Sequence, residues 1–236
     1  NFEIADENAT YIPSVDLADL DFSKKDATAI GGWGGDIKTE IKDGVEVITF
    51  TKQPEPHNVQ VDFENVYPKG AKIRLTMEAK GSVAGSINAG LQNPNGFKGC
   101  GNFGDINLTT DYQTITKTVT CSGDNAKRLL LNVGQYEGTI SIKSVKIEAL
   151  DVPQETVTIS PSGYSTYAAY YPVDYSTLGL KAYKVTLNAA KTGIEMEEVK
   201  GVVPAGVAVL LEGKANTDYA LTKAEGWQNV ASDLKM

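Results

Sequence analysis

Aromatic rings placed between glycines are the feature of this sequence that points most directly to ligand binding. The stretch NPNGFKGCGNFGD, residues 93–105, holds four glycines together with Phe97 and Phe103, and Trp33 lies in GGWGG. Glycine contributes little packing, so a loop ring between glycines has less support from a hydrophobic core. An uncovered aromatic face can stack on the apolar C–H face of a pyranose ring. We predict that these rings contact sugars.

Planar amide side chains recur at outward positions of the predicted strands. An amide donates and accepts hydrogen bonds together, as sugar hydroxyls require. These amides are Gln60, Asn88, Gln92 and Asn132, and Gln135 and Tyr136 follow the last of them in NVGQYEG. Two alternatives stay open at this point, because an outward amide is ordinarily only solvated and Phe103 lies close enough to a strand to belong to the core.

Catalytic motifs are missing from the sequence. Its 30 Asp and Glu residues offer many carboxylate pairs, but those at alternate strand positions, such as Glu46, Asp62 and Glu78, indicate a solvated face. The single histidine, His57, follows PEP at a strand entrance, where we expect a surface or ligand-contacting side chain. There is no nucleophile elbow, phosphate-binding loop or metal-binding histidine pair. We therefore predict that the chain is not an enzyme, with a glycoside hydrolase carrying two facing carboxylates as the alternative.

Charge and hydropathy exclude further classes of function. The net charge is −8 and no basic stripe is present, which disfavours nucleic acid as a partner. No apolar run approaches the ~20 residues that span a bilayer. Two cysteines cannot form a zinc cluster. If 106–108 and 112–118 formed a tight hairpin, Cys100 and Cys121 would lie opposite each other and could form a disulfide, unless the glycines beside Cys100 break the register.

The elements that must position these residues are short strands. KIRLTMEAK and SINAGLQN alternate apolar and polar residues, and no segment has a convincing helical period. This pattern predicts an all-β chain built on an antiparallel β-sandwich. A slip of apolar parity between Ile142 and Val145 indicates a bulge. We place the sandwich at residues 1–151 and a second, smaller, tyrosine-dense β domain at 152–236, and we expect the natural chain to continue beyond Met236.

A resemblance to a known family rests on KGAKIRLTMEAKG, LQN, LTTDYQT and LNVG in this order. Residues 1–150 resemble carbohydrate-binding modules of the family four and twenty-two type. The resemblance implies a jelly-roll, galactose-binding-like sandwich that binds β-linked glycans such as xylan or mixed-linkage β-glucan in a cleft. The residues that it places in this cleft are Trp33, His57, Gln60, Gln92, Phe97, Phe103, Asn132 and Gln135.

The same resemblance implies a structural calcium in many relatives, held by an acidic residue in the opening NFE and by an aspartate in the closing strand. Glu3 fits the first position, whereas IKSVKI puts Lys143 and Ser144 at the second. We expect no other cofactor.

The second domain, with GYSTYAAYYPVDYS and VKGVVPAGVAVLLEG, resembles a small β domain of exported proteins from polysaccharide-using Gram-negative bacteria. This implies an exported bacterial protein at the cell surface or outside the cell, with a catalytic domain in the same chain or in a partner. A structural or adhesion module without a glycan site is the rival hypothesis, and it predicts that Trp33, Phe97 and Phe103 are all buried.

Overall fold

The computed structural model describes residues 20–24, 27, 30–33, 37–49, 58–190 and 192–224. The chain divides between Val152 and Pro153 into two compact units, of which each is described by itself. The boundary predicted from the sequence lies one residue earlier, after Asp151. Within the described residues, no helix is long and apolar enough to cross a membrane.

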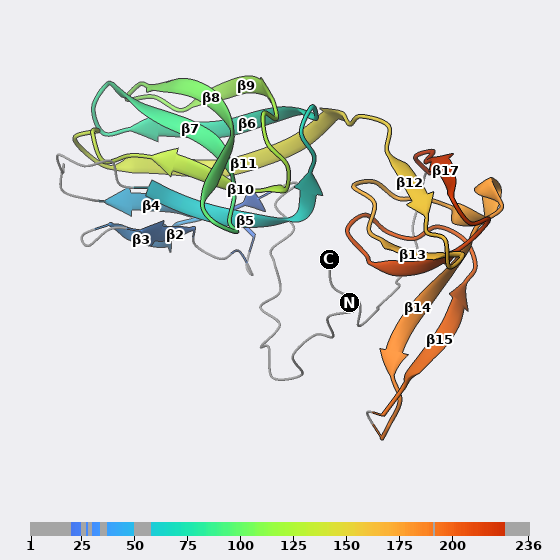
Figure 1. Cartoon of the computed structure of the whole chain (residues 1–236). Coiled ribbons are helices and arrows are strands. Elements are labelled where there is room, and N and C mark those ends of the chain that lie inside the picture. The colour runs from blue at the N-terminus through green and yellow to red at the C-terminus, as the bar shows by residue number, and fades with distance from the viewer. Residues whose placement is uncertain are drawn as a thin grey trace. The chain divides into compact units, whose positions relative to one another are not determined.

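The N-terminal unit contains two antiparallel sheets (Figure 1). The six-stranded sheet has the order β3 (Lys38–Lys42), β4 (Val45–Thr49), β11 (Ile140–Asp151), β6 (Lys72–Gly81) and β9 (Gln113–Thr120), with β1 (Leu20–Asp21) also paired to β11. The five-stranded sheet has the order β2 (Gly31–Trp33), β5 (Asn58–Tyr67), β10 (Ala126–Asn132), β7 (Gly85–Asn93) and β8 (Lys98–Leu108). The prediction of an antiparallel all-β architecture is confirmed.

The eight consecutive strands from β4 to β11 follow the jelly-roll order. They supply β4-β11-β6-β9 to one sheet and β5-β10-β7-β8 to the other, so that the two sheets close over one core. Apolar side chains alternate into this core along β6, where Ile73, Leu75, Met77 and Ala79 are fully buried. The predicted irregularity near Ile142 is confirmed, because the β11–β6 register shifts between Ile142 and Ser144.

β8 departs from the alternation that its neighbours keep. Its pairing with β7 shifts twice, and the residues skipped are Cys100 and Phe103. Burial therefore recurs every third residue, at Cys100, Phe103 and Ile106. Each bulge adds one residue to the strand and turns its side chain toward the core. The prediction that Phe103 presents its ring to a ligand is wrong, because this ring is only 6% exposed and belongs to the core.

The prediction of a hairpin that pairs the two cysteines is also wrong. β8 lies in the five-stranded sheet and β9 in the six-stranded sheet, so the chain crosses between sheets after Leu108. Cys100 and Cys121 are both buried and both free. The pKa of the Cys121 thiol is raised to about 11, mainly because the thiol is buried and to a smaller extent because Cys100 lies nearby.

Tyr136 is a second predicted ligand-binding residue that the structure places in the core. It is 3% exposed, and its hydroxyl donates to the carbonyl of Val83 at 2.6 Å. The ring lies directly over Gly81 and Gly85: a Cβ added at Gly81 would meet the Tyr136 hydroxyl at 2.0 Å. Glycine at these positions thus makes the space that the ring fills, and the prediction of ligand contact is wrong.

Glu46 on β4 contradicts the expectation of a solvated position. Its side chain has no exposed surface, and neither carboxylate oxygen has a hydrogen-bond partner in the described part of the chain. Desolvation raises the pKa of Glu46 to about 7, and a backbone group of Ile30 opposes this shift without completing a hydrogen bond. The parity of β4 is regular, but this strand turns the carboxylate and Ile48 inward together.

The C-terminal unit pairs β12 (Thr156–Ile159) with β17 (Thr217–Ala220) and contains a four-stranded sheet. The sheet order is β13 (Tyr164–Tyr167), β16 (Val209–Glu212), β14 (Lys181–Leu187) and β15 (Ile194–Val199), and a 3-10 helix spans Tyr175–Leu178.

The tyrosines of this unit surround the buried carboxylate of Glu155. The backbone N–H of Tyr170 and the hydroxyl of Tyr167 donate to it at 2.8 and 3.2 Å. Burial raises the pKa of Glu155, and these two donors oppose the shift. Tyr183 on β14 is half-buried, and its hydroxyl donates to the Glu212 carboxylate at 2.5 Å. The Tyr167 hydroxyl and the Tyr170 backbone thus satisfy a carboxylate that is buried inside this unit.

Candidate functional site

The outward face of the five-stranded sheet carries most of the predicted amides. The inward residues of β5, β7 and β10 alternate with them and fill the core. Strand register arranges the outward residues in three rows. We call this surface the amide face. The upper row contains Asn132, Asn88 and Asp105, the middle row Gly31, Gln60, Leu130, Gly90 and Asn102, and the lower row Asp62, Arg128, Gln92 and Gly99.

The upper row presents donors and acceptors side by side. Asn132 pairs with Asn88, and Asn88 pairs with Asp105. The Asn88 side-chain amide donates to the Asp105 carboxylate at 3.4 Å, and an amide oxygen can at the same time accept hydrogen bonds from a ligand. Cross-strand neighbours lie about 5 Å apart, so one ligand can reach consecutive members of this row.

The middle row has little side-chain bulk. Gly31 and Gly90 flank Gln60 and Leu130 in register. Without side chains at 31 and 90, a flat ligand can approach the backbone of the sheet closely. Leu130 is a half-buried apolar side chain among polar ones, suited to contact the C–H face of a sugar ring.

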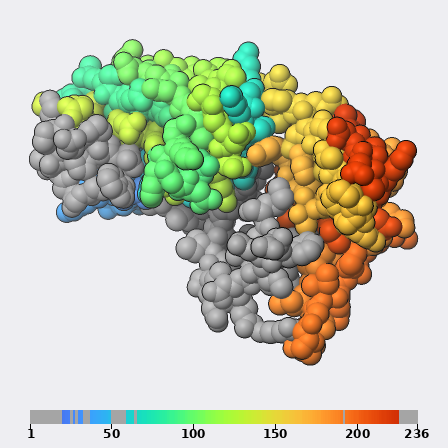
Figure 2. Space-filling view, in the orientation of Figure 1, coloured from blue at the N-terminus to red at the C-terminus, as the bar shows by residue number. Residues whose placement is uncertain are grey.

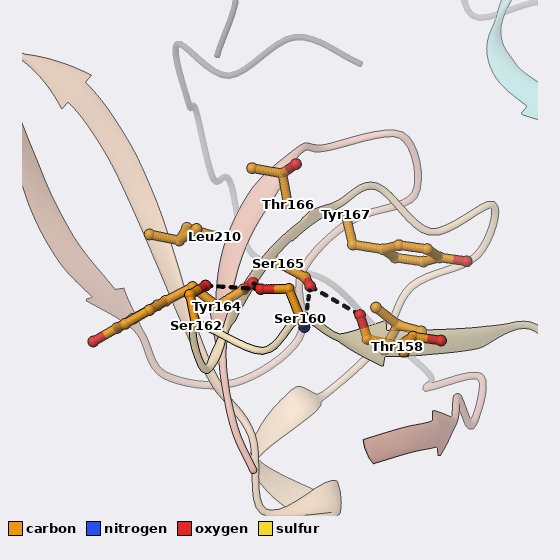
Figure 3. Close-up of a pocket in the computed structure, with 9 residues that line it drawn as sticks. Thr158, Ser160, Ser162, Tyr164, Ser165, Thr166, Tyr167 and Leu210 are labelled. Atoms are coloured by element: carbon orange, nitrogen blue, oxygen red, sulfur yellow. Dashed lines mark hydrogen bonds between the residues drawn. The ribbon is translucent and has the colours of Figure 1, made fainter. Parts of the chain in front are cut away.

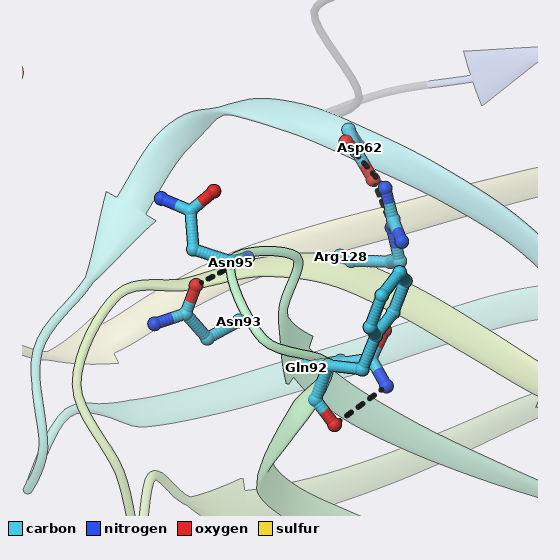
Figure 4. A network of polar contacts seen from close by, with 6 residues as sticks. Asp62, Gln92, Asn93, Asn95 and Arg128 are labelled. Carbon is cyan, nitrogen blue, oxygen red and sulfur yellow. Dashed lines mark hydrogen bonds and ion pairs between the residues drawn. The ribbon is translucent and has the colours of Figure 1, made fainter.

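An ion pair anchors the lower row. Arg128 is 14% exposed and holds the Asp62 carboxylate through both Nε and Nη2, the latter at 2.9 Å to Oδ2 (Figure 4). The hydrogen bond to Asp62 raises the pKa of Arg128, against the lowering effect of burial. A bidentate pair fixes the plane of the guanidinium group. Gln92 lies opposite Arg128 on β7.

The turn between β7 and β8 lifts Phe97 into solvent. Its ring is 72% exposed, and its backbone has φ of 53°, the left-handed region that large side chains rarely adopt. The turn is nevertheless held firmly: the Gln92 side-chain amide donates to the Phe97 backbone carbonyl at 3.2 Å, and the side-chain Oδ1 of Asn93 accepts from the Asn95 N–H at 2.9 Å (Figure 4). The green segment that contains this turn forms part of the molecular surface (Figure 2).

The amide face gathers some of the predicted residues and not others. Gln60, Asn88, Gln92 and Asn132 lie on it, and Phe97 follows Gln92 through the turn. Gln135 is exposed in the turn after β10 and lies outside the three rows. The backbone of Trp33 ends β2 opposite Asn58, whereas its side chain, His57 and Glu3 fall outside the described residues.

Several residues of the amide face were not predicted from the sequence to belong to a site. Asp62 and Arg128 lie 66 positions apart, so their pairing follows only from the β5–β10 register. Leu130 was not predicted because it lies between two other leucines in RLLLN. Its parity with Arg128 and Asn132 nevertheless indicates an outward side chain. Asn102 and Asp105 follow the bulges of β8, which no local pattern fixes.

The described residues do not fit the calcium that the resemblance implies. Glu3 lies outside them, and Lys143, at the position expected for the acidic partner, forms an ion pair with Glu78 at 2.6 Å. An ammonium group cannot ligate a cation. Across the part of the chain that the structure describes, no group of three or more His, Cys, Asp or Glu side chains is arranged to hold a metal ion.

No protein-family model matches the chain, and no curated protein does.

Several solved structures similar to part of the chain are carbohydrate-binding modules. BiXyn10A CBM1 in its apo form is 20% identical with a TM-score of 0.43, over 56% of this chain and 97% of that one. A CBM4 module is 22% identical with a TM-score of 0.40, over 51% and 79%. The second N-terminal cellulose-binding domain of β-1,4-glucanase C from Cellulomonas fimi is 13% identical with a TM-score of 0.46, over 64% and 100%. With identities under 25% and TM-scores under 0.5, these likenesses assign the chain neither a family nor a function.

Proposed function

We propose that the amide face binds a neutral carbohydrate without catalysing a reaction. The observation that carries the proposal is the arrangement of Asn88, Gln92, Gln60 and Asn132 in register on one open sheet face, next to the exposed Phe97. Side-chain amides match sugar hydroxyls as paired donors and acceptors, and an aromatic ring supplies a stacking platform.

A strained, exposed phenylalanine costs stability twice, since its backbone conformation is unfavourable and its ring stays in water. The described turn does not bury this ring to recover that cost. A ligand that covers the ring would recover it. The rival structural module requires Phe97 to be buried, and its 72% exposure speaks against that alternative.

We favour an extended β-linked polysaccharide, with xylan or mixed-linkage β-glucan first. From β5 to β8 the face spans three strand spacings, about 14 Å, enough for about three consecutive sugar residues. The face is open, so its contacts compensate only a small part of the entropy that the ligand loses on binding. We therefore expect a Kd of about 10–100 μM.

A hydrolase is the weaker candidate for this face. Glycoside hydrolysis needs one carboxyl group free to donate a proton. Asp62 already accepts two N–H groups from Arg128, and Asp105 accepts from Asn88. Both carboxylates of the amide face are thus already engaged by neighbouring side chains.

Native electrophoresis through gels that contain xylan or mixed-linkage β-glucan tests the binding proposal, with a starch gel as the control. We expect retardation in at least one β-glycan gel and no release of reducing sugar on incubation. Unretarded migration in every β-glycan gel would refute the proposal, and sugar release would move the assignment to an enzyme.

The location and the partners belong to the same proposal. The resemblance of the C-terminal unit supports an exported bacterial protein at the cell surface or outside the cell, working beside a catalytic domain in its own or a partner chain. Fractionation of the native host with an antibody against this chain tests the location, and a cytoplasmic signal alone would contradict it.

A further inference from the structure

The C-terminal unit contains a pocket of about 560 Å³. It lies between β12, the turn that follows it and β13, and Leu210 of β16 closes one side (Figure 3). This volume is in the usual range for small-ligand sites. None of its lining residues carries a charge, so a charged ligand would lose its hydration without gaining a counter-ion.

Hydroxyl groups line this pocket in fixed orientations. Ser165 Oγ accepts the Ser160 N–H at 3.0 Å and donates to the Thr158 carbonyl at 2.8 Å. Ser160 Oγ also contacts Ser162 Oγ at 2.7 Å. These bonds hold the hydroxyl oxygens in place before any ligand arrives, which reduces the ordering cost of binding. Each oxygen keeps acceptor capacity for a further donor.

Two tyrosines lie on either side of these serine hydroxyls in Figure 3. Tyr164 is 41% exposed. Tyr167 is anchored through its own hydroxyl, which donates to the buried Glu155 at 3.2 Å. Within the described residues, no hydrogen bond engages the hydroxyls of Tyr164 and Thr166. The pocket thus offers apolar ring faces, fixed hydroxyl acceptors and two unengaged hydroxyl groups.

We propose that this pocket is a second carbohydrate site, which takes one or two neutral sugar residues at a chain end or within a short oligosaccharide. A sugar ring combines neutral hydroxyl groups with an apolar C–H face, and this is the combination that the lining matches. The site is separate from the amide face and does not depend on its function. Occupied together, the two sites would give the chain two attachment points on a polysaccharide.

The test is heteronuclear NMR on the full chain labelled with nitrogen-15, titrated to about 10 mM with cellohexaose, xylohexaose or maltohexaose, the range that weak exposed sites require. We expect saturable shifts of the backbone amides of 158–167 with at least one of these sugars. Shifts confined to β5, β7 and β10 would overturn the second site while supporting the amide face. Shifts confined to 158–167 would do the reverse.

Variants assign any shift to this pocket. Tyr164→Ala and Thr166→Val should each weaken the response of 158–167, Tyr164→Ala by roughly tenfold in Kd. Met196→Ala, on the exposed edge strand β15 outside the pocket, should leave it unchanged. A response that survives both pocket variants, or an equal response to an oligogalacturonate, would overturn the proposal of a neutral-sugar site here.

Discussion

Arg128 on β10 donates two hydrogen bonds to the Asp62 carboxylate on β5, across a strand pair that brings together residues 66 positions apart. The pair fixes the lower row of the amide face opposite Gln92. Arg128→Met should therefore weaken glycan binding by roughly tenfold, because it removes the planar donor group that holds the Asp62 carboxylate in one orientation beside Gln92. Isothermal titration calorimetry with the polysaccharide identified on affinity gels checks this.

A matched control is available on the other sheet. Arg74 pairs with Glu148 at 2.9 Å between β6 and β11, and its side chain is 39% exposed. Arg74→Met should leave binding unchanged and cost no more than about 1 kcal/mol of stability. If both arginine variants lose binding equally, the lower row of the amide face has no specific role.

Phe97 and Phe103 separate ligand contact from core packing. Phe97→Asn should lower the affinity by roughly tenfold. It should also maintain or raise the free energy of unfolding by up to about 1 kcal/mol, because asparagine tolerates the left-handed conformation. Phe103→Ala should cost about 3 kcal/mol or more, as a cavity opens in the core. Urea denaturation measures both effects, and a large stability loss in Phe97→Asn would show that its ring packs against the fold.

Glu46 makes stability depend on pH. Its folded pKa of about 7 lies above the ordinary value, so the folded state holds the proton more tightly than the unfolded chain. The associated stabilisation is complete at low pH, below the unfolded pKa, and is lost as the pH rises through about 7. Glu46→Gln should flatten this dependence and stabilise the protein by roughly 1–3 kcal/mol above neutral pH.

The control for that measurement is Glu40→Gln, at an exposed position of β3. This variant should keep the wild-type slope of stability against pH. Identical slopes in the wild type and Glu46→Gln would contradict the assignment of the titration to the buried carboxylate.

Gly81 makes room for the Tyr136 ring. An alanine there would bring Cβ to 2.0 Å from the hydroxyl oxygen, so Gly81→Ala should cost about 2–3 kcal/mol. The double variant with Tyr136→Phe should recover part of this loss, because the clashing atom is gone. Gly99→Ala, where an added Cβ meets nothing within 4 Å, should be neutral. Additive losses in the double variant would contradict the clash.

The sequence predicted the features that follow from regular alternation of apolar and polar residues. It did not predict features that depend on a break in this alternation or on packing against residues distant in the chain. The outward amides and the bulge near Ile142 follow from period two. Phe103 was misplaced because two bulges convert β8 to period three. Tyr136 was misplaced because the glycines that receive its ring lie more than 50 positions away. Parity does not reveal which of the two faces of a strand is covered, and on β4 the covered face is that of Glu46 and Ile48. This is why the burial of Glu46 was missed.

Calorimetric titration of two triple variants tests the central claim most directly. Gln60→Ala/Asn88→Ala/Asn132→Ala removes three amides from the amide face, and Thr114→Ala/Thr116→Ala/Thr118→Ala removes three exposed side chains from the outward face of β9. Titrated with the β-glycan that retards the wild type, the first variant should lose detectable binding and the second should retain the wild-type Kd. Equal affinity of the two variants would contradict a carbohydrate site on the amide face.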